Sequence, residues 1–157
     1  QSGLGAEQIF DQIAESKNLE VKNARRRENI HKHIDKYITQ ESKTWSVDIK
    51  ARKKTSRSDS DAQDEWIWIE FQNVRGNLGW LYGEADNIAF ETQDSFVIVD
   101  RKSLIDYVEN AVDMAKPVRK SYLAKYKTYQ RAGRNDLLTM VELSKIIENC
   151  KHFVWQK

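Results

Sequence analysis

Two short units place an acidic side chain two residues before a polar or cationic one. Asp48 and Lys50 flank one residue in the segment "SVDIK", and Glu70 and Gln72 flank one residue in the apolar segment "WIWIEFQNV". In a β-strand, residues two apart share one face, so each acid is expected to lie beside its partner. A carboxylate in apolar surroundings is costly to bury unless a cation, a hydrogen-bond network or a metal ion compensates its charge. These four residues are therefore the candidates for chemistry.

A pair of carboxylates at one point of a sheet is typical of a divalent-metal site. If the two strands are paired neighbours, a suitable register brings Asp48 close to Glu70. The two carboxylates would repel each other unless a cation lies between them. Mg²⁺ prefers carboxylate, carbonyl and water oxygens, and it can activate water and stabilise the charge that builds on a phosphate. We predict Asp48 and Glu70 as ligands of Mg²⁺, which Mn²⁺ could replace, and Lys50 or Gln72 as the residue that orients the attacking water.

Periodicity and turn signals predict the elements that must hold these residues. The apolar stripe and the polar breaks in the first half indicate, in order, a helix over 6–30 interrupted near 16–18, a hairpin of strands 33–39 and 44–51, a polar and mobile loop over 52–65, and a third strand over 66–74. The second half indicates strands 85–91 and 95–100, a helix over 101–116 stopped by Pro117, a helix or loop over 118–133, a closing strand and short helix within 137–147, and a last strand over 152–157. The predicted fold class is α+β or α/β: an N-terminal helix, a three-stranded antiparallel meander, further strands and C-terminal helices.

Composition limits the class of protein. With 157 residues, 39% hydrophobic and 32% charged, the chain is expected to form one globular domain over 1–157. Its apolar runs are too short to span a membrane, and no signal peptide is visible at the start. The single cysteine, Cys150, excludes an internal disulfide and indicates a reducing, cytoplasmic compartment.

Positive charge is concentrated in one part of the chain. Residues 25–57 contain eleven Lys and Arg against four acids, although the net charge of the whole chain is only +2. Such a block could be a solvated surface or could meet a phosphate backbone. A second basic segment, "YQRAGRND", surrounds a glycine turn. The candidate nucleic-acid-binding residues are Arg52, Lys53, Lys54, Arg57, Arg131 and Arg134.

The order of a helix, a meander, an acid on the second strand and an acid-x-polar unit on the third resembles the PD-(D/E)xK, or restriction-endonuclease-like, nuclease superfamily. Matched residue by residue, Asp48 stands for the first acid, Glu70 for the second and Gln72 for the lysine. The segments "GWLYGEADNIAFET" and "SFVIVDRKSL" are similar to strands of phage and homing-type members, so the resemblance covers roughly residues 20–110. It implies a restriction-endonuclease-like core and a phage-encoded enzyme that works in the host cytoplasm.

The chain departs from the family pattern at the lysine, because Gln72 occupies its place. Lys50 could supply the ammonium from the neighbouring strand. In a second register, Asp35 is the first acid and Asp48 with Lys50 forms the D-x-K unit, with thirteen positions from one aspartate to the other. The predicted order of helix and strands favours the Asp48/Glu70 register.

Three further candidate residues lie near the junction of the first helix and the meander. Glu28 occupies a helix position where the superfamily often carries another acid, and a solvent-facing helix glutamate is the alternative. His31 and His33 could ligate a metal or could be local polar packing.

The sequence therefore predicts a Mg²⁺-dependent DNA endonuclease, with RNA a less expected substrate. Cleavage would proceed by in-line attack of a metal-activated water on the phosphodiester. A symmetric homodimer or larger oligomer is expected if both strands are cut at one site. Two alternatives stay open: a catalytically inactive nuclease-like module that still binds nucleic acid, and a protein-interaction domain in which Glu70 is a buried ion-pair partner.

Overall fold

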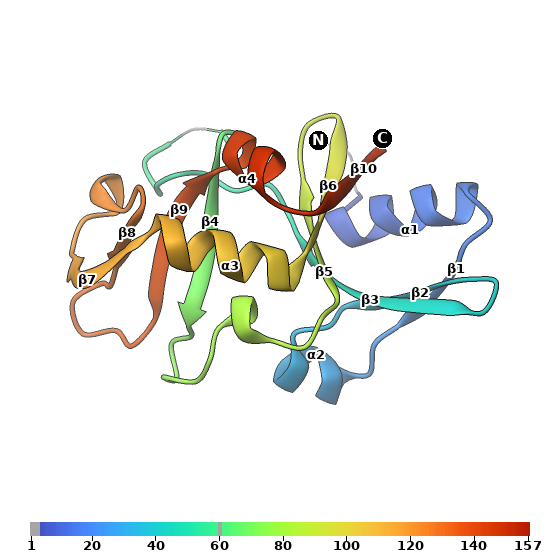
Figure 1. Ribbon diagram of the computed structural model, residues 1–157, viewed down its shortest axis with the longest axis horizontal. Helices are drawn as coiled ribbons and strands as arrows, with labels where there is room; N and C mark the ends of the chain where they lie inside the picture. Colours follow the sequence, from blue (N-terminus) through green and yellow to red (C-terminus); the bar gives the residue numbers. More distant parts are fainter. Residues whose placement is uncertain (1–3, 60) are drawn as a thin grey trace. The chain divides into compact units, whose positions relative to one another are not determined.

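The computed structural model describes residues 4–59 and 61–157 (Figure 1). These residues form an α+β structure with four α-helices and two mixed sheets. The chain divides into two compact units, each built from separate stretches of sequence. Unit 1 comprises the chain up to Arg52 together with Glu84–Arg101 and His152–Lys157, and unit 2 comprises Lys53–Gly83 and Lys102–Lys151. The single nuclease-like domain over 1–157 stays a prediction.

Unit 1 is built on a six-stranded sheet with the order β1-β2-β3-β5-β6-β10. β1, β2 and β3 form an antiparallel meander, β3 pairs in parallel with β5, and β5, β6 and β10 continue antiparallel (Figure 1). The elements are α1 (Ala6–Ser16), β1 (Glu20–Asn23), α2 (Arg26–Lys32), β2 (Lys36–Gln40), β3 (Lys43–Lys50), β5 (Asn87–Glu91), β6 (Ser95–Asp100) and β10 (His152–Gln156).

Helix α1 supplies the apolar stripe that packs with the inner face of this sheet. Phe10 and Ala14 are fully buried in a cluster with Ile38 of β2 and Val47 of β3. The Phe10 ring meets the Phe96 ring edge-on, with 5.3 Å between centroids. Because period two places Val47 and Ile49 on this inner face, Ser46, Asp48 and Lys50 point to the opposite face of β3.

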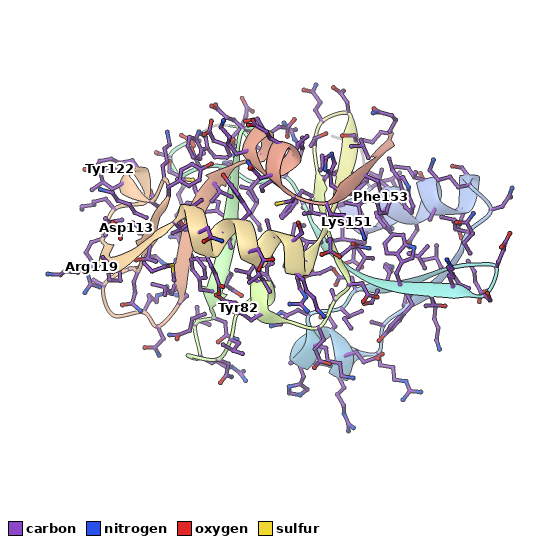
Figure 2. The ribbon with its side chains drawn as sticks, viewed as in Figure 1. Tyr82, Asp113, Arg119, Tyr122, Lys151 and Phe153 are labelled. Atoms are coloured by element: carbon purple, nitrogen blue, oxygen red, sulfur yellow. The ribbon has the colours of Figure 1, made fainter. Side chains whose placement is uncertain are left out.

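Unit 2 is built on a four-stranded sheet with the order β4-β9-β8-β7. The elements are β4 (Trp66–Gln72), the 3₁₀ helix η1 (Trp80–Tyr82), α3 (Arg101–Ala111, whose first residue belongs to unit 1), β7 (Asp113–Val118), the 3₁₀ helix η2 (Ser121–Leu123), β8 (Lys127–Tyr129), β9 (Leu137–Glu142) and α4 (Leu143–Asn149). Tyr82, labelled in Figure 2, donates its hydroxyl to Glu109 Oε2 at 2.6 Å and so ties η1 to α3. Tyr122 on η2 is 71% exposed.

Most of the predicted elements are confirmed, including the hairpin, strands β4, β5 and β6, and the closing strand–helix–strand segment. Three expectations were wrong. Residues 127–129 form strand β8 within the segment that was expected to be a helix or loop. Residues 20–23 form strand β1 where the sequence indicated an interrupted helix. The helix expected over 101–116 ends at Ala111, and the following residues form β7 with Pro117 inside it. An edge strand tolerates proline because its outer N–H groups need no partner.

The predicted composition of the meander was also wrong. The third strand of the meander was expected to be residues 66–74, but β4 pairs with β9 in the other sheet. The unrecognised strand β1 completes the meander instead, so β2 is its second strand and β3 its third. In the described part of the chain, no helix has both the length and the apolar character needed to cross a membrane.

Candidate active site and nucleic-acid interface

The strand pairing that would have placed Asp48 beside Glu70 does not occur. The neighbours of β3 are β2 and β5, whereas β4 pairs with β9. Glu70 instead accepts a hydrogen bond at Oε1 from the backbone N–H of Trp80, at 3.2 Å. Gln72 donates from Nε2 to the carbonyl of Asn135 at 2.6 Å. Both side chains therefore hold backbone segments together within unit 2. The catalytic roles predicted for them lack the expected strand pairing between β3 and β4.

Asp35, immediately before β2, lies beside strand β3, which carries Asp48. The ladder between β2 and β3 ends where Lys36 pairs with Val47. Beyond this pair, the backbone N–H of Ile49 on β3 donates a hydrogen bond to Asp35 Oδ2 at 2.7 Å. Asp35 Oδ1 accepts a second hydrogen bond, from Asn29 Nδ2 at 2.6 Å. The Asp35 carboxylate thus extends the sheet by one hydrogen bond and is held in a fixed orientation.

Asp48 is an almost fully buried acid, with 4% of its surface exposed. Lys50 Nζ lies 3.3 Å from Asp48 Oδ1. Asp48 Oδ2 is buried and has no hydrogen-bond partner among the described residues. Burial raises the pKa of Asp48 from its ordinary value of 3.8 to about 7; the positive charge of Lys50 opposes this rise, and the Asp35 carboxyl adds to it. A neutral or cation-bound Asp48 is therefore favoured at this position.

These residues fit a hard divalent cation. Two ionised carboxylates can only accept hydrogen bonds, so Asp48 Oδ2 needs either a proton or a positively charged ligand. Residues 4–59 and 61–157 contain no cluster of three or more His, Cys, Asp or Glu side chains placed for a metal. Mg²⁺ commonly uses one or two carboxylates and completes its shell with water. The donor set of Asp35 and Asp48 therefore suits Mg²⁺ better than Zn²⁺, which needs more nitrogen or sulfur ligands.

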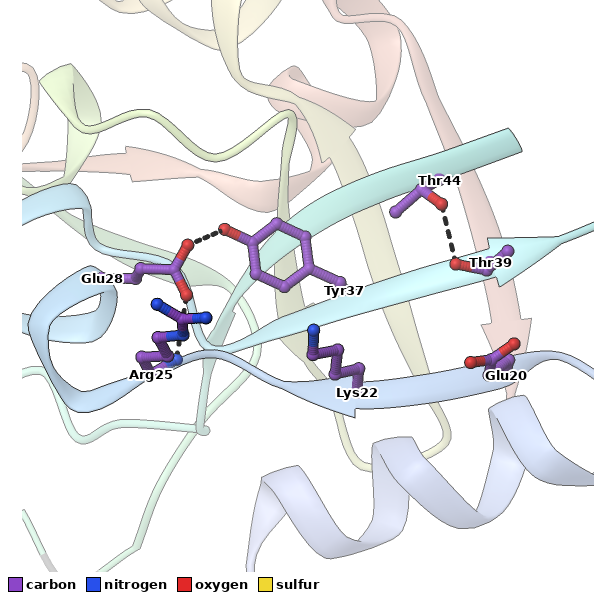
Figure 3. Close-up of a pocket in the computed structure, with 7 residues that line it drawn as sticks. All are labelled: Glu20, Lys22, Arg25, Glu28, Tyr37, Thr39 and Thr44. Atoms are coloured by element: carbon purple, nitrogen blue, oxygen red, sulfur yellow. Dashed lines mark hydrogen bonds between the residues drawn. The ribbon is translucent and has the colours of Figure 1, made fainter. Parts of the chain in front are cut away.

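Glu28 lines a pocket on unit 1. Its cavity of about 390 Å³ lies over β1 and β2 and is drawn in Figure 3. Tyr37 donates its hydroxyl to Glu28 Oε2 at 2.5 Å, and the Arg25 backbone N–H donates to Oε1 at 3.0 Å. The hydrogen bond to Glu28 raises the pKa of Tyr37 to about 12. Glu28 Oε2 thus ties α2 to β2 through Tyr37, whereas Oε1 caps the N-terminus of α2, and both bonds favour a structural role.

The two predicted histidines also lie at α2. His31 is exposed in its last turn, and His33 ends the helix in the left-handed conformation with φ of 56°. Their place at the C-terminus of α2 explains both residues without a metal, since histidine there can interact favourably with the last helix carbonyls.

The two basic segments meet in unit 2, although more than seventy positions separate them in the sequence. Lys53, Arg57, Arg131 and Arg134 line one groove of about 1020 Å³. The backbone carbonyl of Lys54, just outside the lining, accepts a hydrogen bond from Trp68 Nε1 at 3.2 Å. Arg52 belongs to unit 1, where its backbone N–H donates to Glu91 Oε1 at 3.2 Å. Four of the six predicted nucleic-acid-binding residues are therefore brought together around one concave surface.

Several neighbours of these sites were not identified from the sequence. Asn29 has no motif of its own, and only the structure shows that it orients Asp35. Trp68 in the groove was not identified, because a strand pattern does not reveal which face stays accessible. The spacing from Asp35 to Asp48 was a signal in the sequence, but it competed with the Asp48/Glu70 register.

No protein-family model matches this chain, and no curated protein or solved structure matches it significantly.

Proposed function

We propose that this protein is a Mg²⁺-dependent DNA endonuclease whose active centre is formed by Asp35, Asp48 and Lys50 in unit 1. The observation that carries the proposal is the buried Asp48 carboxyl, one oxygen of which lacks a donor while the other faces Lys50. In a purely structural buried ion pair, hydrogen bonds would be expected to both oxygens of the carboxylate. A second acid, Asp35, stands next to it and adds to its raised pKa.

The meander supports a restriction-endonuclease-like core for unit 1. The PD-(D/E)xK pattern needs a helix, a meander, an acid at the second strand and acid-x-lysine on the third. With β1 as the first strand, Asp35 immediately precedes the second strand and Asp48 and Lys50 lie on the third. The parallel strand β5 follows after the chain passes through unit 2. In this register the lysine position holds a lysine, so the departure at Gln72 disappears.

Each residue has a distinct task in this proposal. Asp35 and Asp48 would hold Mg²⁺, which when bound supplies a Lewis acid that activates water and neutralises charge on the phosphate. Lys50 orients the attacking water by hydrogen bonding and stabilises negative charge at the scissile phosphate. Asn29 and the Ile49 amide hold Asp35 in place, and so position the centre without touching substrate.

DNA is the proposed partner because basic side chains gather in the unit 2 groove. The proposal includes action in a host cytoplasm and, for cleavage of both strands at one site, a symmetric dimer.

A cleavage assay on plasmid and oligonucleotide DNA, with Mg²⁺, Mn²⁺ or EDTA, tests the proposal. Asp35→Asn, Asp48→Asn and Lys50→Ala should each reduce cleavage by about 100-fold or more, since general-acid/base and metal-positioning groups contribute on that scale. Glu70→Gln is the matched control, because it removes the charge of the competing acid and leaves unit 1 unchanged.

The outcomes separate the alternatives. Loss of cleavage in Glu70→Gln together with full activity in Asp35→Asn would refute the register. A wild-type protein that binds DNA tightly but does not cut it in the presence of any of the metals would indicate an inactive binding module. A protein that neither binds nor cuts would indicate the protein-interaction alternative.

A further inference from the structure

Aromatic side chains line one face of the four-stranded sheet of unit 2. Trp66 and Trp68 alternate with buried Ile69 along β4, so both indoles point to the same face. Trp68 contacts the Tyr129 ring of β8, with centroids 5.7 Å apart and planes tilted by 43°. Trp66 contacts the Tyr126 ring at 6.0 Å. All four rings are partly exposed, which differs from the fully buried aromatics of the unit 1 core.

Trp68 and Tyr129 belong to the wall of the basic groove. The hydrogen bond from Trp68 Nε1 to the Lys54 carbonyl holds the indole in one orientation. A ring that is fixed by its edge loses little conformational entropy when a planar ligand stacks on it. The groove therefore contains a rigid stacking surface.

Positive charge surrounds this surface. The lining includes two lysine or arginine side chains from 53–57 and two arginines from 131–134. One acid, Asp59, lies beside it and accepts hydrogen bonds from Thr55 and Ser56. Arg131 is anchored by an ion pair of 2.5 Å with Asp136, which is only 3% exposed. Ser121 adds a hydroxyl group to the lining, whereas the Thr55 hydroxyl donates to Asp59 and the Ser56 hydroxyl is hydrogen-bonded to Ser58.

We propose that this groove binds an unpaired stretch of DNA, with bases stacked on Trp68 and Tyr129 and phosphates held by Arg131 and Arg134. Double-stranded DNA presents base edges and phosphates, but the faces of its bases are hidden by their neighbours. An aromatic surface bordered by cations instead suits single strands, where each stacked base contributes to binding irrespective of sequence. This inference rests on the proposed nuclease function and deepens it, because it specifies the preferred substrate as DNA that carries an unpaired segment.

Binding is tested in EDTA, so that no cleavage interferes. The fluorescence anisotropy of a dye-labelled dT 12-mer, a length of about the site size of single-strand-binding grooves, is compared with that of a 12-mer of abasic sites. Both carry the same phosphates, but only the first has bases. The wild-type protein should bind the dT oligonucleotide roughly ten-fold or more tightly than the abasic one, and more tightly than a duplex of equal length.

Variants then assign the preference to the groove. Trp68→Ala should lower affinity for dT part of the way to the abasic level, because Tyr129 still offers one stacking ring, and Trp68→Phe should restore most of the loss. The double variant Trp68→Ala with Tyr129→Ala should bind dT and abasic strands equally. Arg134→Ala should weaken dT and abasic binding by similar factors, because it removes a phosphate contact. The abasic comparison uses the wild-type protein, so it remains decisive even if Trp68→Ala fails to fold.

Three results would overturn the inference: equal affinity for dT and abasic strands, tighter binding of the duplex, or tighter binding of an RNA strand of the same length. Its failure is distinguishable from that of the nuclease proposal. Base-dependent binding without cleavage would support the groove and refute the enzyme, whereas metal-dependent cleavage with equal binding of dT and abasic strands would do the reverse.

Discussion

Replacing Asp48 with asparagine should make the protein more stable at alkaline pH while abolishing cleavage. The pKa of Asp48 is raised from 3.8 to about 7 in the folded protein, chiefly by burial. Between these pH values the folded state binds more protons than the unfolded state. The free energy of unfolding therefore falls as pH rises through this window. Asparagine cannot ionise, so the variant should lack this loss.

The size of the effect follows from the two pKa values. Each unit of difference is about 1.4 kcal/mol, so the full cost of ionising Asp48 in the fold approaches roughly 4 kcal/mol above the folded pKa. About 2–3 kcal/mol of this cost develops between about pH 5 and pH 8, and the rest develops below pH 5. The asparagine variant should therefore gain about 2–3 kcal/mol relative to wild type over that interval.

Urea unfolding followed by circular dichroism, in EDTA from pH 5 to pH 8, measures this difference. Asp94→Asn is the matched control, because Asp94 is exposed in the turn between β5 and β6 of the same unit. Addition of Mg²⁺ at pH 8 should stabilise the wild-type protein more than Asp48→Asn, since the variant keeps only the Asp35 carboxylate of the two proposed ligands. Parallel stability profiles for wild type and Asp48→Asn would refute the reasoning that Asp48 is an uncompensated buried acid.

Three other substitutions give distinct expectations. Lys50→Ala should lose cleavage by about 100-fold or more but keep DNA affinity in EDTA, as measured by nuclease assay and anisotropy. Glu70→Gln should keep cleavage within a few-fold of wild type in the same assay, and a large loss would argue for the other register. Gly79→Ala should lower the free energy of unfolding, measured by urea unfolding, by at least about 2 kcal/mol, because its Cβ would collide with the Glu70 carbonyl. Gly5→Ala, whose added Cβ would meet no atom within 4 Å, is the control without a collision and should show only the smaller cost of alanine at the N-cap of α1.

Local sequence signals predicted the elements well where periodicity and breaks agreed. The α1 stripe around Phe10, the β2–β3 hairpin and the buried run of β6 each follow from spacing alone. The four-residue strand β1 was missed because it carries one half-buried residue, Val21, among exposed neighbours. Its stability comes from pairing with β2, which is a non-local interaction that a window of sequence does not contain.

The same missed strand explains why the sequence favoured the Asp48/Glu70 register. Without β1, the hairpin counts as the first two strands of a meander and β4 becomes the third, so Glu70 falls on the position of the second acid. With β1 counted, every position moves back by one strand, and Asp35 takes the place of the first acid. The Asp35/Asp48 and Asp48/Glu70 registers were both visible in the sequence. The choice between them depends on which strands pair, and tertiary packing determines that pairing.

Of the candidate residues, Asp48 and Lys50 are common to both registers, because they share a face of β3 whichever strand lies alongside. What the sequence could not supply was the surroundings that give the pair its chemistry. Burial of Asp48 to 4% exposure and the absence of a donor for Oδ2 among the described residues arise from elements distant in sequence. A D-x-K unit on an exposed strand would be an ordinary surface pair with an ordinary pKa. It is the enclosure of this unit beside Asp35 that changes a common strand pattern into a candidate metal centre.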